Sequence, residues 1–137
     1  MSRFDGRLWL ARLLIAAVIA WNLQAAFSFL MDPDAYAPAF ELGGAAGAAA
    51  LRGMAVLFVM WNVPYLVACF QPRRRRLSLW EALVMQIVGV LGETFILFGL
   101  PAGHILLAGS LIRFIAFDAA GLPALGAALF LTRSPKA

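Results

Sequence analysis

The chain has 137 residues, of which 64% are hydrophobic and 13% are charged. Ordinary soluble domains have about 45–50% apolar and about 25% charged residues, so this composition excludes a typical soluble domain. It predicts a single membrane domain over residues 1–137. The net charge is +4, but the basic residues cluster in short segments beside apolar runs, so we expect no nucleic-acid partner. The single cysteine, Cys69, excludes an internal disulfide, and we expect a packed thiol.

Four apolar runs of membrane-spanning length follow one another along the chain. They cover residues of about 8–30, 45–70, 78–100 and 104–132. Because only helices and closed barrels can span a bilayer, these runs predict an all-α integral membrane four-helix bundle with antiparallel, up-and-down spans. The first run could also be a cleaved signal peptide, but Trp21, Asn22 and Gln24 stand where small residues would be needed.

Two local signals concern the ends and continuity of these runs. Ser78 and Glu81 have the spacing of a capping box and predict the start of the third span. The last run is long for one perpendicular span, so we expect it either to tilt or to break near residues 121–123.

The basic residues fall on one side of the predicted bundle. The first loop, residues 31–44, holds Asp32, Asp34 and Glu41 and no Lys or Arg. The positive-inside rule therefore predicts that both termini are cytoplasmic and that the protein lies in the cell (inner) membrane. The residues on the cytoplasmic side are Arg3, Arg7, Arg12, Arg73, Arg74, Arg75, Arg76, Arg133 and Lys136. The basic loop formed by Arg73, Arg74, Arg75 and Arg76 is also expected to contact anionic headgroups.

Glu93 lies inside the third run, where a carboxylate costs roughly 2.5–3.5 kcal/mol on insertion scales. We therefore expect a partner for it, and Arg52 and Arg113 are the candidates. At a rise of 1.5 Å per residue, Glu93 lies roughly 10 Å from the non-cytoplasmic end, Arg113 roughly 13 Å and Arg52 roughly 9 Å. Gln24 is at a similar depth, and Gln86 shares a face with Glu93 across Gly89. The predicted intramembrane polar layer is Gln24, Arg52, Gln86, Glu93 and Arg113.

This layer has two interpretations. Glu93 could pair with either arginine and hold the bundle in register. Alternatively, the unmatched positive charge could receive an anionic headgroup, a quinone carbonyl or a small anion. Secondary candidates are Asn62 and Tyr65, beside Pro64, and Asp118, deeper in the last run.

The sequence contains no recognisable catalytic apparatus. His104 lies in a turn, where we expect a solvated residue, and no His/Asp/Glu spacing suggests zinc, haem or di-iron. There is no nucleophile elbow, phosphate loop or HExxH motif. We therefore predict no catalytic residues, no metal and no cofactor, although a bound lipid or quinone would fit the polar layer.

The segments Leu51-Arg52-Gly53 and Arg113…Asp118…Gly121-Leu122-Pro123, set in four short spans, resemble the DoxX-like group of small four-helix membrane proteins. The resemblance implies a bundle often linked to respiratory or quinone-handling complexes. It also implies that Arg52, Arg113 and Asp118 are the residues of this chain that correspond to the family's pattern.

Taken together, these features predict a non-catalytic accessory or structural subunit of a membrane complex, or a homo-oligomer. Small residues at 43/47 and 46/50 would let a neighbouring helix approach closely. The expected partners are the lipid bilayer and either other membrane subunits or a second copy. The alternative is a small ligand-binding or transport protein for a quinone, lipid or anion. A membrane-embedded enzyme acting on a lipid or quinone is a third, weaker alternative.

Overall fold

The computed structural model describes residues 5–133, and within this range the chain is helical and has no β-strand. Arg3 and Lys136 lie outside the described residues. The long helices α1, α3, α4 and α5 are each long and apolar enough to cross a membrane, which confirms the prediction of an all-α chain with four candidate spans. The elements are α1 (Gly6–Met31), α2 (Pro33–Tyr36), the 3-10 helix η1 (Ala37–Phe40), α3 (Gly44–Phe70), α4 (Arg76–Gly99) and α5 (Ile105–Leu131).

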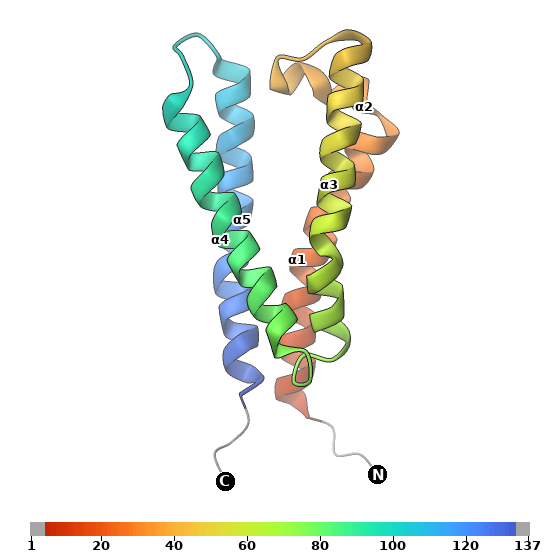
Figure 1. Cartoon of the computed structure of the whole chain (residues 1–137), viewed down its shortest axis with the longest axis vertical. Helices are drawn as coiled ribbons and strands as arrows, with labels where there is room; N and C mark the ends of the chain where they lie inside the picture. Colours follow the sequence, from red (N-terminus) through yellow and green to blue (C-terminus); the bar gives the residue numbers. More distant parts are fainter. Residues whose placement is uncertain (1–4, 134–137) are drawn as a thin grey trace.

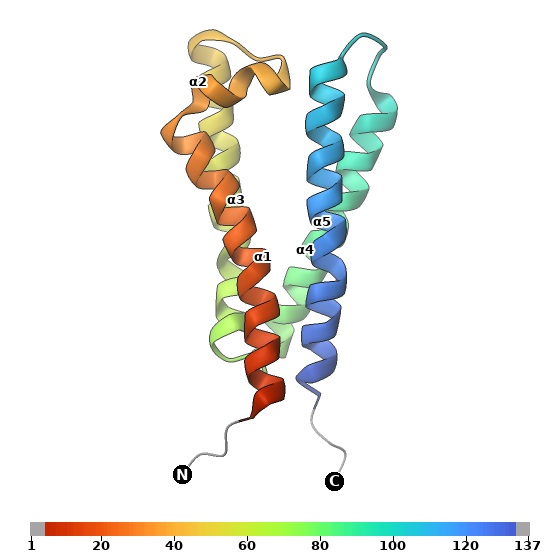
Figure 2. The same ribbon diagram turned by 180° about the vertical axis from the view of Figure 1, so that it is seen from behind.

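The long helices form two pairs that touch each other at one end. Helix α1 packs along α3, and α4 packs along α5 (Figure 1). Contacts of α1 with α5 and of α3 with α4 complete a ring among the described residues. The pairs are close at the end where the chain begins and finishes, and they diverge toward the opposite end, as Figure 2 shows from behind.

The main apolar core lies at the closed end of the bundle and draws on all four long helices. Tyr65 is its largest member, and its side chain is fully buried. Helix α4 supplies core residues only from its first half, which explains why its second half can lean away. The buried members of this core are Ala11, Ile15, Val18, Ile19, Tyr65, Ala68, Leu79, Ala82, Leu125, Ala128 and Leu129.

A second apolar cluster lies toward the open end, and α4 takes no part in it. Phe29 of α1 is its centre and contacts the rings of Tyr36, Phe40, Phe58 and Phe114. The cluster therefore joins α1, the first loop and α3, with a single ring reaching across from α5. The two helix pairs are held by fewer apolar contacts here than in the core.

The helix starts differ from the sequence signals. Asp5 caps α1, since its carboxylate accepts hydrogen bonds from the backbone N–H groups of Arg7 and Leu8 at 3.2 and 3.3 Å. The predicted capping box at Ser78 and Glu81 is wrong. Helix α4 already begins at Arg76 and has no side-chain cap. The preceding residues form a turn in which the N–H of residue 75 is bonded to the carbonyl of residue 71 at 2.8 Å, and α4 follows it directly.

The two prolines inside the spans do not interrupt them. Pro64 lies within α3 and Pro123 within α5, and both helices are continuous. The break considered for residues 121–123 is therefore wrong. Gly121 and Leu125 on either side are buried against neighbouring helices, and this packing holds the turn together although Pro123 has no N–H to donate.

The open end is bridged by the first loop. Glu41, the residue that ends η1 with a left-handed φ of 58°, accepts a hydrogen bond from the backbone N–H of Leu107 at 3.2 Å and contacts Nδ1 of His104. Ser110 of α5 donates to the carbonyl of Ala39. His104, expected in a solvated turn, is half-exposed there and has Glu41 as its ion-pair partner. These contacts join α5 to the loop that follows α1.

The Glu41 contact predicts a pH-dependent stability. The hydrogen bond with His104 lowers the pKa of Glu41 from its ordinary value of 4.5. A lowered pKa means that the stabilisation is complete above pH 4.5 and is lost as the pH falls through the lower folded value. Between pH 5 and pH 3, we expect the wild-type protein in detergent to lose more of its melting temperature than Glu41→Gln does. The control is Glu81→Gln, on an exposed position of α4, and an unchanged pH profile in Glu41→Gln would contradict the prediction.

Candidate functional site

A cavity of about 290 Å³ lies between the four long helices, one to two helical turns beyond the main core. Each helix contributes one polar side chain, namely Asn22 from α1, Asn62 from α3, Glu93 from α4 and Asp118 from α5. We call it the acidic cavity. Its other lining residues are Trp21, Ala25, Phe58, Trp61, Val88, Gly89, Gly92, Ile96, Phe114 and Phe117.

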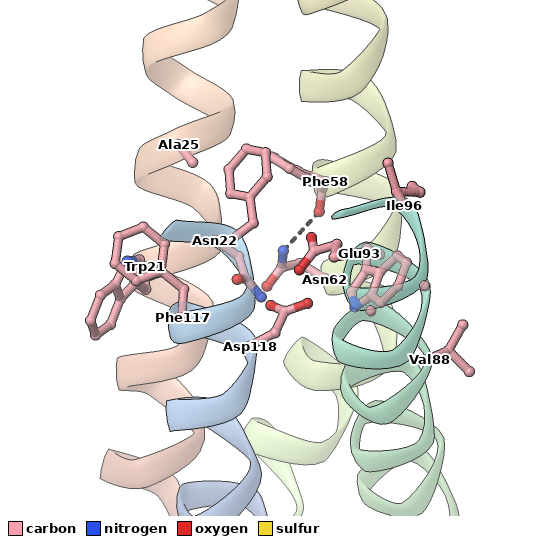
Figure 3. A pocket seen from close by; sticks show the side chains of 14 residues that line it. Trp21, Asn22, Ala25, Phe58, Asn62, Val88, Glu93, Ile96, Phe117 and Asp118 are labelled. Carbon is pink, nitrogen blue, oxygen red and sulfur yellow. Dashed lines mark hydrogen bonds between the residues drawn. The ribbon is translucent and has the colours of Figure 1, made fainter. Parts of the chain in front are cut away.

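Figure 3 shows how the polar side chains lie. The groups of Asn22, Asn62, Glu93 and Asp118 point toward one another in the middle of the cavity, while Phe117 and Trp21 form one flank. The amide nitrogen of Asn62 donates to the carbonyl of Phe58 at 2.7 Å, a bond within its own helix. This bond turns the other end of the amide, its oxygen, toward the cavity.

A buried chain of hydrogen bonds links three helices beside the cavity. Trp61 donates through Nε1 to the hydroxyl of Tyr65 at 3.0 Å. That hydroxyl lies 2.6 Å from Oε1 of Gln86 and 3.0 Å from the carbonyl of Ala82. Gln86 in turn donates through Nε2 to the carboxylate of Asp118 at 2.9 Å and to its carbonyl at 3.2 Å. Helix α3 is thus joined to α5 through the amide of α4.

Two glycines make room for this chain. A Cβ at Gly89 would overlap with Oδ2 of Asp118, and a Cβ at Gly121 would lie 2.6 Å from Nε2 of Gln86. Real Cβ atoms almost never approach so closely, so a side chain at either position would displace the carboxylate of Asp118 or the amide of Gln86. The space beside Gly89 therefore accommodates the Asp118 side chain of α5.

Two hydrogen-bond acceptors at the cavity receive no hydrogen bond. Oε2 of Glu93 and Oδ1 of Asn62 are buried and have no hydrogen-bond partner within residues 5–133. No basic side chain lines the cavity. The ion pair expected between Glu93 and either Arg52 or Arg113 is therefore wrong. In the described part of the chain, the ion pairs join Arg73 to Asp5 at 2.6 Å and His104 to Glu41.

The residues of the predicted polar layer lie in different places, because similar depths do not determine the direction in which each side chain points. Glu93 lines the acidic cavity, and Gln86 lies beside it, bonded to Asp118. Gln24 and Arg113 line a second cavity nearer the open end. Arg52 is exposed on α3 and lines neither. The secondary candidates Asn62 and Asp118 line the acidic cavity, and Tyr65 lies directly behind it.

Asn22 is the site residue that the sequence interpretation missed. It was weighed only as an obstacle to signal cleavage, whereas Gln24, which is nearer the end of the helix, was included in the layer. The buried positions Ile15, Ile19 and Ala26 of α1 recur at intervals of three to four residues around Asn22. That helical spacing places Asn22 on the inward face and Gln24 off it. It is visible only in the structure, because α1 is apolar on nearly every side and its sequence does not mark the inward face.

The remaining predicted residues lie away from the cavity. In the basic loop, Arg73 pairs with Asp5, Arg74 and Arg75 are exposed, and Arg76 is the first residue of α4. Cys69 packs against the main core, with its sulfur 3.7 Å from the carbonyl of Arg12, as expected for a packed thiol.

The arrangement offers a ligand two carboxyl groups, two amides and aromatic walls. Among the described residues, no three His, Cys, Asp or Glu side chains gather in a way that could hold a metal ion. The polar groups are thus suited to a molecule that brings its own hydrogen-bond donors or positive charge. Comparison of the chain with protein-family models, curated proteins and solved structures finds no match, so the resemblance to the DoxX-like group stays a prediction.

The close packing at Gly89 predicts a sharp difference between neighbouring glycines of α4. Gly89→Ala should displace the carboxylate of Asp118 from Gln86 and lower the melting temperature in detergent, because a buried hydrogen bond to a charged group contributes about 1.5–3 kcal/mol. Gly92→Ala is the matched control, since a Cβ there meets nothing within 4 Å. Its only effect should be the helix-propensity gain of up to about 1 kcal/mol. Equal behaviour of the two variants would refute this packing.

Proposed function

We propose that the chain is an integral protein of the cell membrane with both termini and the Arg73–Arg76 loop on the cytoplasmic side. The four apolar helices support membrane insertion. The loop between α1 and α3 contains only acidic charged residues, whereas the α3–α4 loop carries consecutive arginines, and this asymmetry supports the orientation. The open end of the bundle then faces the non-cytoplasmic side.

We infer that the protein is a non-catalytic ligand-binding or transport protein whose acidic cavity binds an apolar molecule bearing an ammonium group. One observation carries the proposal: Glu93 and Asp118 line the same cavity between spans, and no basic side chain lines it. A carboxylate at this depth needs a proton, a donor or a cation. A protonated amine provides both donors and charge, and the unpartnered oxygens of Glu93 and Asn62 would accept its N–H groups.

The cavity walls support an apolar body for this ligand. Trp21, Trp61, Phe58, Phe114 and Phe117 surround the polar group. Aromatic faces attract cations by roughly 0.5–2 kcal/mol and pack well against hydrocarbon or ring systems. A volume of about 290 Å³ is at the lower end of small-molecule pockets, which suits a compact ligand.

The polarity of the cavity argues against the other ligands considered for the polar layer. A small anion or phosphate would face two carboxyl groups without a positive partner, and like charges repel. A quinone carbonyl could accept a hydrogen bond from the amide of Asn22, but it brings no donor for the unpartnered oxygens of Glu93 and Asn62. An ammonium group is the chemistry that the lining residues complement best.

A second candidate function is an accessory subunit or homo-oligomer, and the first half of α3 favours it. Gly47 packs on Leu42 of the loop, so the 43/47 pair receives no helix from within the chain. The other small residues are exposed, and a Cβ at Gly53 would meet nothing within 4 Å. This surface, formed by Ala46, Ala49, Ala50 and Gly53, could receive a helix of another subunit.

Binding of 1-naphthylmethylamine to the purified protein, followed by quenching of tryptophan fluorescence, tests the ligand proposal. We expect the amine to bind at least about tenfold more tightly than 1-naphthylmethanol, because a hydrogen bond to a charged group contributes about 1.5–3 kcal/mol. Glu93→Gln should remove most of that difference and leave binding of the alcohol unchanged. Its melting temperature should not fall, since no ion pair is lost.

Glu81→Gln, on an exposed face of α4, is the control and should keep the preference for the amine. Equal binding of amine and alcohol by the wild-type protein would refute the proposal. If instead Glu93→Gln chiefly lowers the stability or dissociates an oligomer, the structural function is favoured.

A further inference from the structure

The second cavity, of about 430 Å³, lies nearer the open end between α1, the first loop and α5. Its polar side chains differ in kind from those of the acidic cavity. Gln24, Ser28, Tyr36, Ser110 and Arg113 can all donate hydrogen bonds, and no carboxylate is among its lining residues. We call it the donor cavity. The two cavities share Trp21, Ala25, Phe114 and Phe117 in their walls.

Arg113 is held in place and keeps its charge available. Ser110 is buried, and its hydroxyl donates to the carbonyl of Ala39. Arg113 then donates through Nη2 to the same hydroxyl at 2.9 Å. No carboxylate within residues 5–133 forms an ion pair with Arg113. The guanidinium therefore retains further N–H groups for an external acceptor.

The other donors of the cavity are also unengaged. Within the described chain, no hydrogen bond joins the side-chain amide of Gln24 or the hydroxyls of Ser28 and Tyr36 to another residue. Tyr36 is held by the stacking of its ring on Phe29, with the centroids 5.5 Å apart. A cluster of free donors around one cation complements a multivalent oxyanion.

Arg113 lies closer to the lipid headgroups than to the middle of the bilayer. Helix α5 has 27 residues and is about 40 Å long, against a hydrocarbon core of about 30 Å. Arg113 lies about 12 Å from the start of the helix, and so about 7 Å inside the core if the helix is centred. An arginine side chain extends over such a distance to the interface.

We propose that the donor cavity binds a phosphate group, carried by an anionic phospholipid of the non-cytoplasmic leaflet. Arg113 and Gln24 hold the phosphate oxygens, and the acyl chains lie along the exposed apolar residues of α1 and α5. Those residues include Phe27, Leu30 and Ile112. This site is distinct from the amine site, because its polar side chains belong to different residues, although the two cavities share four wall residues.

Native mass spectrometry of the delipidated full-length protein tests this site. We expect phosphatidylglycerol to remain bound at several-fold higher occupancy than diacylglycerol, which has the same chains and no phosphate. Arg113→Gln should reduce the occupancy of phosphatidylglycerol several-fold without changing that of diacylglycerol. Arg52→Gln is the matched control, because Arg52 is exposed at a similar depth and lines neither cavity. It should behave as the wild-type protein does.

Gln24→Leu is a second variant, and it removes no hydrogen bond within the described chain, so we expect it to fold. It too should weaken retention of phosphatidylglycerol. Inorganic phosphate, added as a competitor, identifies the source of the group. Displacement of the lipid only at high phosphate concentration supports the headgroup, whereas Arg113-dependent binding of phosphate to lipid-free protein at micromolar concentration supports a free anion in the same site. Equal retention of the two lipids, or equal losses in Arg113→Gln and Arg52→Gln, would overturn the proposal.

Discussion

The hydrogen-bonded chain from Tyr65 through Gln86 to Asp118 is the interaction on which the rest of the bundle depends. It joins α3, α4 and α5 at the level where the main core ends and the helices begin to separate. In a bilayer the helices gain little from burying apolar side chains against one another, so a polar link and close glycine contacts determine where they meet. Gly89 and Gly121 allow this approach, and neither could be replaced without moving a member of the chain.

The same link gives the molecule its asymmetry. Below it, all four long helices share one apolar core, whereas beyond it α4 buries no further side chain and the helix pairs diverge. The divergence leaves two cavities with shared aromatic walls and opposite chemistry, one lined by carboxyl groups and the other by donors around Arg113. The first loop then reconnects the pairs through Glu41 and Ala39.

The two proposed sites follow from this separation of charge. If Glu93 and Arg113 were paired, each cavity would have one charged group fewer that lacks a partner. Because they face different cavities, each keeps unsatisfied bonding capacity. A membrane protein bears the cost of such groups where they serve binding, which is why intramembrane ionisable residues indicate functional sites.

The four helices, and the presence of a costly carboxylate within one of them, can be predicted from the sequence alone. Long apolar runs can satisfy their backbone in lipid only as helices, so four spans and the exceptional position of Glu93 followed directly. Their depths followed from the rise per residue. Which helix faces meet depends on the packing of the folded chain and could not be predicted in this way. The runs are apolar on nearly every side, so periodicity says little about rotation around each axis, and a side chain at the right depth can point to either cavity or to lipid. For this reason Glu93 shares a cavity with Asn22 and Asp118, whereas Arg113 lines the other cavity and Arg52 is exposed.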